Sequence, residues 1–301
     1  MLSLLSTNMS FPFNFKTQLL VFLTLFLISD NGYAKVSESY PAATSEMTFN
    51  SFGQRMSGFI YHPSGQGPHP TVLLLHGYPG NEKSLDVAQG LRSNGWNVVF
   101  FHYRGAWGSE GEFSFVNAEA DVESVLHYLN NEENAKNLRI DNPRISVVGH
   151  SMGGHMALSG IFNTPFVRCA VSYDGANLGV SDVGIIDDPE TDIPWKAYSD
   201  TLFMLNGWSG QKAERELKEY GKSLNLVRRT KSINGRPVLL VVADSKVIPI
   251  KSHIKPLFQA LKNTKNSDIT YKVINDDHSF NSNRPELIET TLSFLDSKCR
   301  D

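Results

Sequence analysis

The chain has 301 residues, of which 41% are hydrophobic and 20% are charged, a composition typical of globular domains. The formal net charge is −3 and no long basic block occurs, so nothing indicates nucleic acid or an anionic membrane surface as a partner. No spacing of cysteine, histidine or carboxylate residues is typical of a zinc site, and the length allows a single α/β domain.

The first apolar run, TQLLVFLTLFLIS at residues 17–29, is followed by Gly32 and Ala34 in small-x-small spacing. This pattern predicts a secretory signal peptide over residues 1–34, cleaved after Ala34. The run is short for a membrane span, which needs about 20 residues, so an uncleaved anchor is the lesser alternative. We therefore expect residues 35–301 to be exported, to a periplasm or beyond the cell, and to meet a membrane only if the signal segment is uncleaved.

The sequence leaves two further points open. Translation could start at Met1 or at Met9, which would give the signal peptide a shorter leading segment. The two cysteines, Cys169 and Cys299, could pair in an exported protein, but Cys169 lies in an apolar run, where a free cysteine packs like a small hydrophobic residue.

From residue 70 onward, short apolar runs alternate with helical patterns. The runs predict strands over residues 71–76, 96–103, 144–150, 168–174, 237–244 and 268–274. The periodic stretches predict helices over 118–131, after Ser151, and over 285–297, and residues 47–61 are expected to form an antiparallel hairpin. Strands that are apolar throughout and separated by helices indicate an α/β fold with a mostly parallel sheet covered on both faces.

Residues 175–235 interrupt this alternation without a strong strand. They contain a predicted amphipathic helix over 211–226 whose inner face is Ala213, Leu217, Tyr220 and Leu224. An insert of this size between two core strands is expected to form a helical lid over the active site, although it could also be only a packing element. Its acidic run (Asp182, Asp187, Asp188, Glu190 and Asp192) could hold a cationic amine of a substrate or simply be solvated.

The stretch VVGHSMGG places Ser151 between a predicted strand and a predicted helix, in a G-x-S-x-G pattern. Such a strand-to-helix turn is tight and requires small neighbours, and it raises the serine hydroxyl above the carboxyl edge of the sheet. The serine also stands at a helix N-terminus, which favours developing negative charge. Ser151 is therefore the predicted nucleophile.

A nucleophilic serine needs a base and an oxyanion hole. His278 follows the last predicted strand and precedes the last helix, so its loop can return an imidazole to the carboxyl edge; we expect it to be the base. The backbone N–H groups of Tyr78, in the loop HGYPGNEKS, and of Met152 are the expected oxyanion donors. His76, at the strand end, is expected to order that loop by hydrogen bonding.

The acid that orients the base is Asp244 in this prediction, because it ends the fifth strand and gives the chain order Ser151, Asp244, His278. Asp174, at the end of the preceding strand, is the next candidate. Asp276 and Asp277, in the histidine loop, are the others.

These motifs resemble the α/β-hydrolase superfamily, and more narrowly the bacterial serine hydrolases related to dipeptidyl-peptidase and acylaminoacyl-peptidase (prolyl oligopeptidase-type) catalytic domains. The stretches that carry the resemblance are LLLHGYPG, HYRGAWGSEGEFSF, VVGHSMGG, ADSKVIP and DHSFNSNRPELIETTLSFL. The resemblance implies a serine triad, no cofactor, and hydrolysis of an ester, thioester or amide through an acyl-enzyme. In one departure, an ungapped comparison puts Lys246 where relatives have the acid, and a two-residue deletion is needed to restore Asp244.

Three functions are compatible with this pattern. The first is an exported carboxylesterase-like serine hydrolase acting on a small-molecule ester. The second is a peptidase or aminopeptidase acting on short peptides, which the resemblance and the acidic run suggest. The third is a hydrolase scaffold that has lost catalysis and serves binding, because a fold does not by itself confer an activity.

Overall fold

The structure is a computed structural model that describes residues 40–180, 184–191, 193–265 and 267–300. The predicted signal peptide and the alternative start at Met9 lie outside the described residues. Within these ranges, no helix is both long enough and apolar enough to cross a membrane.

In the described part of the chain, eight strands form one sheet in the order β1-β2-β4-β3-β5-β6-β7-β8. Their bounds are β1 (Ala43–Ser51), β2 (Gln54–His62), β3 (His69–Leu75), β4 (Asn97–Phe101), β5 (Ile140–His150), β6 (Ala170–Tyr173), β7 (Val238–Ala243) and β8 (Ile269–Ile274). The β1–β2 and β2–β4 pairs are antiparallel, and every other pair is parallel. The predicted entry hairpin and mostly parallel sheet are confirmed.

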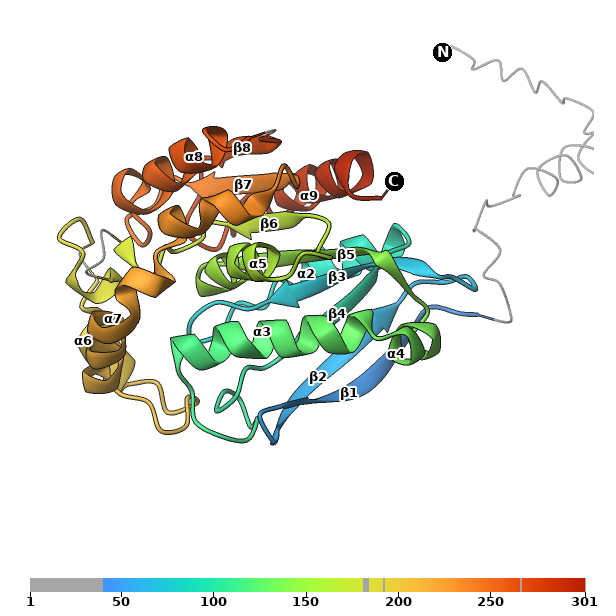
Figure 1. The fold of residues 1–301 in the computed structure, drawn as a ribbon, viewed down its shortest axis with the longest axis horizontal. Helices are drawn as coiled ribbons and strands as arrows, with labels where there is room; N and C mark the ends of the chain where they lie inside the picture. Colours follow the sequence, from blue (N-terminus) through green and yellow to red (C-terminus); the bar gives the residue numbers. More distant parts are fainter. Residues whose placement is uncertain (1–39, 181–183, 192, 266, 301) are drawn as a thin grey trace, which may run out of the picture. The chain divides into compact units, whose positions relative to one another are not determined.

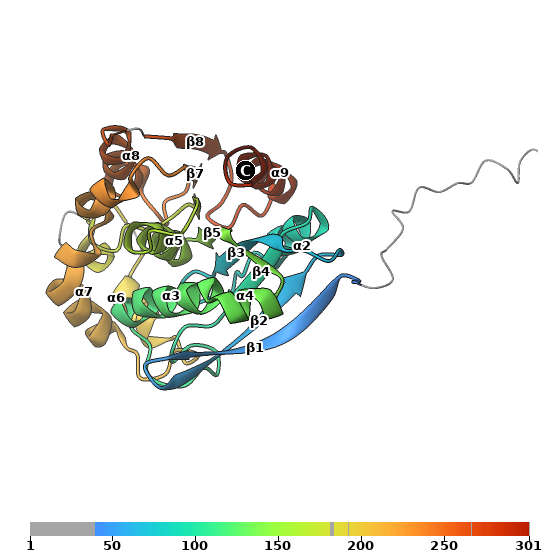
Figure 2. The same ribbon diagram turned by 45° about the vertical axis from the view of Figure 1, so that its right-hand side comes forward.

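The central strands are apolar on both faces because helices cover both faces (Figures 1 and 2). In β3, Leu73 and Leu75 belong to one core cluster, and Val72 and Leu74 belong to the other, as the period-two alternation of a strand requires. The sheet is therefore the middle layer of three.

Helices α2 (Leu85–Ser93) and α9 (Arg284–Lys298) pack on one face, and α3 (Phe115–Asn130), α4 (Glu132–Asn137), α5 (Met152–Asn163) and α8 (Lys255–Lys262) pack on the other. Helix α3 begins after Ser114, whose hydroxyl accepts a hydrogen bond from the Asn117 N–H, a common N-cap arrangement. The helices predicted over 118–131, after Ser151 and over 285–297 correspond to α3, α5 and α9.

The two cysteines form a disulfide. Cys169 directly precedes β6 and Cys299 ends α9, and 130 residues of sequence separate them. Both side chains are fully buried. The pairing that the sequence left open is thus present, and it fastens the last helix to the centre of the sheet.

The insert at residues 175–235 contains α6 (Trp195–Asp200), α7 (Gly210–Leu224) and two short 3-10 segments, η2 (Ile185–Asp187) and η3 (Leu226–Ile233). Figure 1 shows α6 and α7 beside one another at one end of the sheet. A π-helical turn, η4 (Ile250–Ile254), leads into α8.

The predicted inner face of the insert helix was wrong at one position. Tyr220 is 40% exposed, and Gly221 is buried in its place. A Cβ atom on Gly179 would lie only 2.0 Å from the carbonyl oxygen of Gly221. This contact between two backbones centres the buried face on Gly221 and turns the tyrosine outward.

Candidate active site

Ser151 occupies the strained turn that its motif predicted. It links β5 to α5 with φ 58° and ψ −119°, a backbone conformation that non-glycine residues adopt rarely and only where the surrounding structure enforces it. Its N–H donates to the carbonyl of Tyr173 at 2.9 Å, and its carbonyl accepts from the N–H of Ala176 at 3.1 Å. These bonds to β6 and to the loop after it hold the turn in place.

Two glycines of the motif, Gly149 and Gly153, are required because neighbouring backbone lies too close to them to leave room for a side chain. A Cβ atom on Gly149 would lie 2.0 Å from the carbonyl oxygen of Gly153, and one on Gly153 would lie 2.1 Å from that of Leu75. A side chain at either position would therefore push α5 away from the turn or from β3. The small residues around Ser151 are needed to bring the helix N-terminus against the sheet.

His278 lies against a carboxylate at the carboxyl edge of the sheet. Its Nδ1–H donates to Oδ2 of Asp174 at 2.6 Å. The Asp174 side chain is fully buried, whereas that of His278 keeps 17% of its surface exposed. A buried carboxylate on Nδ1 fixes the tautomer that leaves Nε2 free to accept a proton.

The predicted acid, Asp244, does not occupy this position; Asp174 does. The residues around Asp244 instead supply donors to Asp174: the N–H of Ala243 donates to Oδ1 at 3.2 Å, and the hydroxyl of Ser245 donates to Oδ2 at 3.1 Å. Adjacent residues of an extended segment point to opposite sides, so with Ser245 turned toward Asp174 the Asp244 side chain is left exposed. The carboxylate therefore comes from the end of β6, and the loop after β7 only supports it.

Asp174 was the second candidate from the sequence, and one local signal favours it. Its backbone has φ 40°, a region in which Asp and Asn are several-fold enriched over other non-glycine residues. The following residue, Gly175, fits a sharp turn at the strand end. Asp276 and Asp277, by contrast, bind backbone and side-chain groups within the histidine loop itself.

His150, which was not among the candidate residues from the sequence, supports His278. Its Nε2–H donates to the backbone carbonyl of His278 at 2.7 Å, and the two rings lie 4.6 Å apart. Burial, with the nearby His278 as a second cause, lowers the pKa of His150 to about 3. Through this hydrogen bond, a neutral His150 holds the loop that carries the candidate base in position.

The loop after β3, which carries His76 and Tyr78, lies next to Ser151. Neither the N–H of Tyr78 nor that of Met152 donates to an acceptor within the described residues, so both remain available as oxyanion donors. His76 orders this loop, as predicted, because its Nδ1–H donates to the carbonyl of Gly77 at 2.8 Å. Burial lowers the pKa of His76 to about 3, which keeps its ring neutral.

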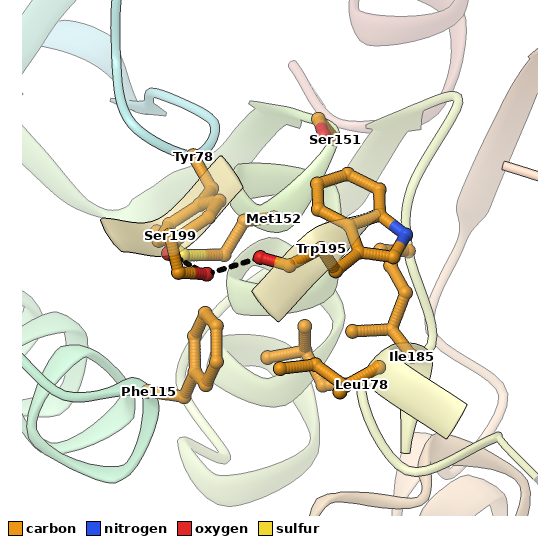
Figure 3. A pocket seen from close by; sticks show the side chains of 10 residues that line it. Tyr78, Phe115, Ser151, Met152, Leu178, Ile185, Trp195 and Ser199 are labelled. Atoms are coloured by element: carbon orange, nitrogen blue, oxygen red, sulfur yellow. Dashed lines mark hydrogen bonds between the residues drawn. The ribbon is translucent and has the colours of Figure 1, made fainter. Parts of the chain in front are cut away.

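A small apolar pocket opens beside Ser151 (Figure 3). The centre of a water molecule can occupy only about 20 Å³ of it, little more than the space that one water needs. Its lining combines core residues with residues of the insert: Tyr78, Phe115, Ser151, Met152, Ala176, Leu178, Ile185, Ile186, Trp195 and Ser199. The two oxyanion candidates and the nucleophile thus share one pocket with the insert.

The side chain of Tyr78 ties the oxyanion loop to the insert. Its hydroxyl donates to Oγ of Ser199 at 2.8 Å and accepts from Nε1 of Trp208 at 2.6 Å. The Ser199 hydroxyl in turn donates to the carbonyl of Trp195 at 2.6 Å. Burial raises the pKa of Tyr78 to about 12, so the hydroxyl stays protonated at any ordinary pH.

Two buried histidines hold the loop that follows Asp174. His253 accepts the N–H of Asn177 on Nδ1 at 3.0 Å and donates from Nε2 to Asp188 at 2.9 Å. His155 does the same with the next amide: Nδ1 accepts the N–H of Leu178 at 3.3 Å, and Nε2 donates to Glu119 at 2.9 Å. The first residues of the insert are therefore fixed to α5 and to η4.

Two of the acidic residues of the insert, Asp188 and Glu190, bind basic side chains of the protein itself. Asp188 is 4% exposed and accepts a hydrogen bond from His253, and Glu190 forms an ion pair with Lys251. Asp187 is exposed. Asp182 and Asp192 lie outside the described residues. The described members thus offer no carboxylate in the pocket for a substrate amine.

Arg104 joins the segment after β4 to α3. Its Nε–H donates to Asp121 at 2.5 Å in a buried ion pair, and its Nη2–H donates to the carbonyl of Asn117 at 3.1 Å. This arrangement holds the rim near Tyr78 rather than presenting the guanidinium to a substrate.

Comparison with known proteins supports a hydrolase fold. Residues 59–165 match the BD-FAE family model. An uncharacterized 31.7 kDa protein of Escherichia coli is 32% identical over 36% of this chain and 38% of its own length. The 2,6-dihydropseudooxynicotine hydrolase of Paenarthrobacter nicotinovorans is 29% identical over 54% of this chain and 43% of its own length. The chain thus spans less than half of these relatives.

Solved structures resemble the chain over more of its length. The Pyrococcus furiosus esterase Pf2001 superimposes with a TM-score of 0.64 at 19% identity, covering 87% of this chain and 92% of the esterase. The Pyrococcus horikoshii acylaminoacyl peptidase gives a TM-score of 0.64 at 17% identity, covering 86% of this chain and 42% of the peptidase. Together with the strand order and the turn at Ser151, these similarities show that the chain has the fold of the α/β-hydrolases.

Proposed function

We propose that the protein is an exported serine hydrolase that cleaves small esters through a triad of Ser151, His278 and Asp174. The observation that carries the proposal is the hydrogen bond between His278 and the buried Asp174, at the same sheet edge as a strained, pocket-lining Ser151. Nucleophile, base and orienting acid each come from the end of a different strand, as the chemistry of this fold requires. The esterase and hydrolase relatives support the same assignment.

The chemistry follows from these positions. Nε2 of His278 accepts the proton of the Ser151 hydroxyl as Oγ bonds to the ester carbonyl carbon, and Asp174 stabilises the resulting imidazolium. The N–H groups of Tyr78 and Met152 bind the oxyanion. His278 then returns the proton to the alcohol oxygen as the C–O bond breaks. A water molecule, deprotonated by the same nitrogen, then bonds to the acyl carbon; the bond from that carbon to Oγ of Ser151 breaks, and His278 returns the proton to Oγ as the acid leaves.

An ester is favoured over a peptide because the described residues that line the pocket include no charged partner for an amine. Asp188 and Glu190 are occupied by His253 and Lys251. Export rests on the apolar run at residues 17–29, and the disulfide between Cys169 and Cys299 agrees with it, because disulfides persist in oxidising compartments.

Labelling with a fluorophosphonate probe tests the proposal. We expect the purified mature protein to be labelled at Ser151, as located by peptide mapping, and the Ser151→Ala variant to remain unlabelled. A separate, unlabelled sample of the enzyme should hydrolyse p-nitrophenyl acetate faster than an aminoacyl p-nitroanilide.

The outcomes separate the alternatives. A preference for the aminoacyl anilide would favour the peptidase. A folded, monodisperse sample that neither labels nor hydrolyses either compound would overturn the proposal and favour a binding scaffold.

A further inference from the structure

The pocket beside Ser151 is on the acyl side of the site. During catalysis the leaving alcohol takes its proton from His278, so the alcohol must face that ring. The residues that line the pocket include both oxyanion candidates, Tyr78 and Met152, but not His278. A carbonyl held by the oxyanion donors therefore directs its acyl substituent into the pocket and its alcohol toward His278, whose side chain is 17% exposed.

The insert closes this acyl pocket with one face of α6. Trp195 and Ser199 are one helical turn apart and both line the pocket, as the i, i+4 spacing requires. Figure 3 shows the Trp195 indole between Ser151 and the side chains of Leu178 and Ile185. The indole is the largest side chain that the insert contributes to the lining, so it is the main limit on the space available.

Trp195 is held by packing and not by a polar bond from its ring. The residue is only 9% exposed, and its Nε1 is buried without a hydrogen-bond partner among the described residues. The ring lies 6.5 Å from that of Tyr78 and 5.9 Å from that of Tyr198. A smaller side chain here would enlarge the pocket without removing a hydrogen bond made by the indole.

We propose that Trp195 sets the upper limit on acyl length and restricts the enzyme to short, apolar acyl esters. The inference rests on the proposed esterase function and adds the substrate class. The free space beside Ser151 accommodates an acetyl or similarly small group, and none of the described residues that line the pocket has a charged side chain for a polar group. Longer chains meet the indole.

The test compares p-nitrophenyl acetate with p-nitrophenyl octanoate, which share a leaving group. We expect the wild-type kcat/KM to be at least about tenfold higher for the acetate, since even one misfitting methylene is worth about tenfold or more. Trp195→Ala should raise the octanoate-to-acetate ratio by at least about tenfold, and Trp195→Phe should raise it less. Phe203→Ala, which truncates an aromatic ring of the insert that is 91% exposed and outside the lining, should leave the ratio unchanged.

Each result decides the matter. A wild type that cleaves octanoate as readily as acetate overturns the inference but leaves the esterase intact. An unchanged ratio in Trp195→Ala overturns it as well, and if that variant does not fold, an unchanged ratio in Trp195→Phe does so. A wild type that cleaves neither ester and does not label at Ser151 overturns the inference together with the function on which it rests.

Discussion

The Nδ1 atom of His278 lies 2.6 Å from Oδ2 of Asp174, although 104 residues separate them in the sequence. The carboxylate is supplied by the end of β6. The last residue of β7, Ala243, contributes its N–H to Asp174, and the loop after β7 contributes the hydroxyl of Ser245. The first prediction follows from this arrangement.

Asp174→Asn should reduce kcat by about 10⁴-fold with little change in KM, because the amide no longer enforces the imidazole tautomer or stabilises the imidazolium. Asp244→Asn is the matched control, since that side chain is exposed, and its kcat should stay within a few-fold of wild type. Steady-state kinetics of both variants on p-nitrophenyl acetate test which of the two carboxylates acts as the acid. A large loss in Asp244→Asn with activity retained in Asp174→Asn would reverse the assignment.

Tyr78→Phe should loosen the contact between the oxyanion loop and the insert. The change removes the acceptor of the Trp208 Nε1–H and the donor to Ser199. An unpaired buried donor costs about 1–3 kcal/mol, which corresponds to a fall in Tm of several degrees for a domain of this size.

Differential scanning calorimetry should show a lower Tm for Tyr78→Phe, and steady-state kinetics should show a lower kcat/KM. Tyr198→Phe serves as control, because the Tyr198 hydroxyl takes part in neither contact and its loss should change the free energy of unfolding by no more than about 0.5 kcal/mol. Equal losses of Tm in the two variants would show that the Tyr78 hydroxyl does not fasten the insert.

Acidification should destabilise the fold through its buried neutral histidines. The pKa values of His150 and His76 are lowered from 6.5 to about 3 in the folded protein, with burial as the main cause. Between these values the unfolded chain binds more protons than the native state, so stability rises with pH. The contribution is complete above pH 6.5 and is lost as the pH falls toward 3.

We therefore expect Tm to fall between pH 7 and pH 5, above the range in which most carboxylates titrate. The His150→Gln variant, whose amide can still donate to the His278 carbonyl, should show a shallower dependence over the same range. A wild-type Tm that is constant or rises on acidification, or a His150→Gln slope equal to that of wild type, would contradict the prediction.

Removal of the disulfide should lower stability without dismantling the site. The Cys169→Ala/Cys299→Ala variant opens a loop of 130 residues, for which the chain-entropy model gives about 5 kcal/mol. Urea unfolding of oxidised wild type, reduced wild type and variant would measure the effect. Dithiothreitol should shift the wild-type midpoint and leave that of the variant unchanged; a midpoint insensitive to both changes would show that the bond contributes nothing.

The parts of the fold and site that could be predicted are those that depend on local pattern. The apolar strand runs, the glycines around Ser151 and the position of His278 before the last helix are all local signals, and each corresponds to the structure. The choice between Asp174 and Asp244 is different. Both end a core strand, and which side chain faces the histidine depends on how the loop after β7 turns, which no periodicity encodes.

The same reasoning explains the error at Tyr220. Helical spacing placed it beside Ala213, Leu217 and Leu224, but the buried face is centred on Gly221 because a distant glycine, Gly179, contacts the backbone there. A contact between two backbones leaves no hydrophobic signal in either segment. The support that His150 gives to His278 was missed for a related reason: it runs through a backbone carbonyl, which every residue has.

The position of Asp174 also limits how this scaffold can be diversified. The acid is the last residue before the insert, and the next few residues line the pocket and are fixed by His155 and His253 through the amides of Leu178 and Asn177. A chimera that exchanges the insert for another sequence should therefore have its first junction after Gly179 and keep His253 with an acidic partner. A junction placed directly at the end of β6 would remove the hydrogen bonds that hold the chain next to the acid.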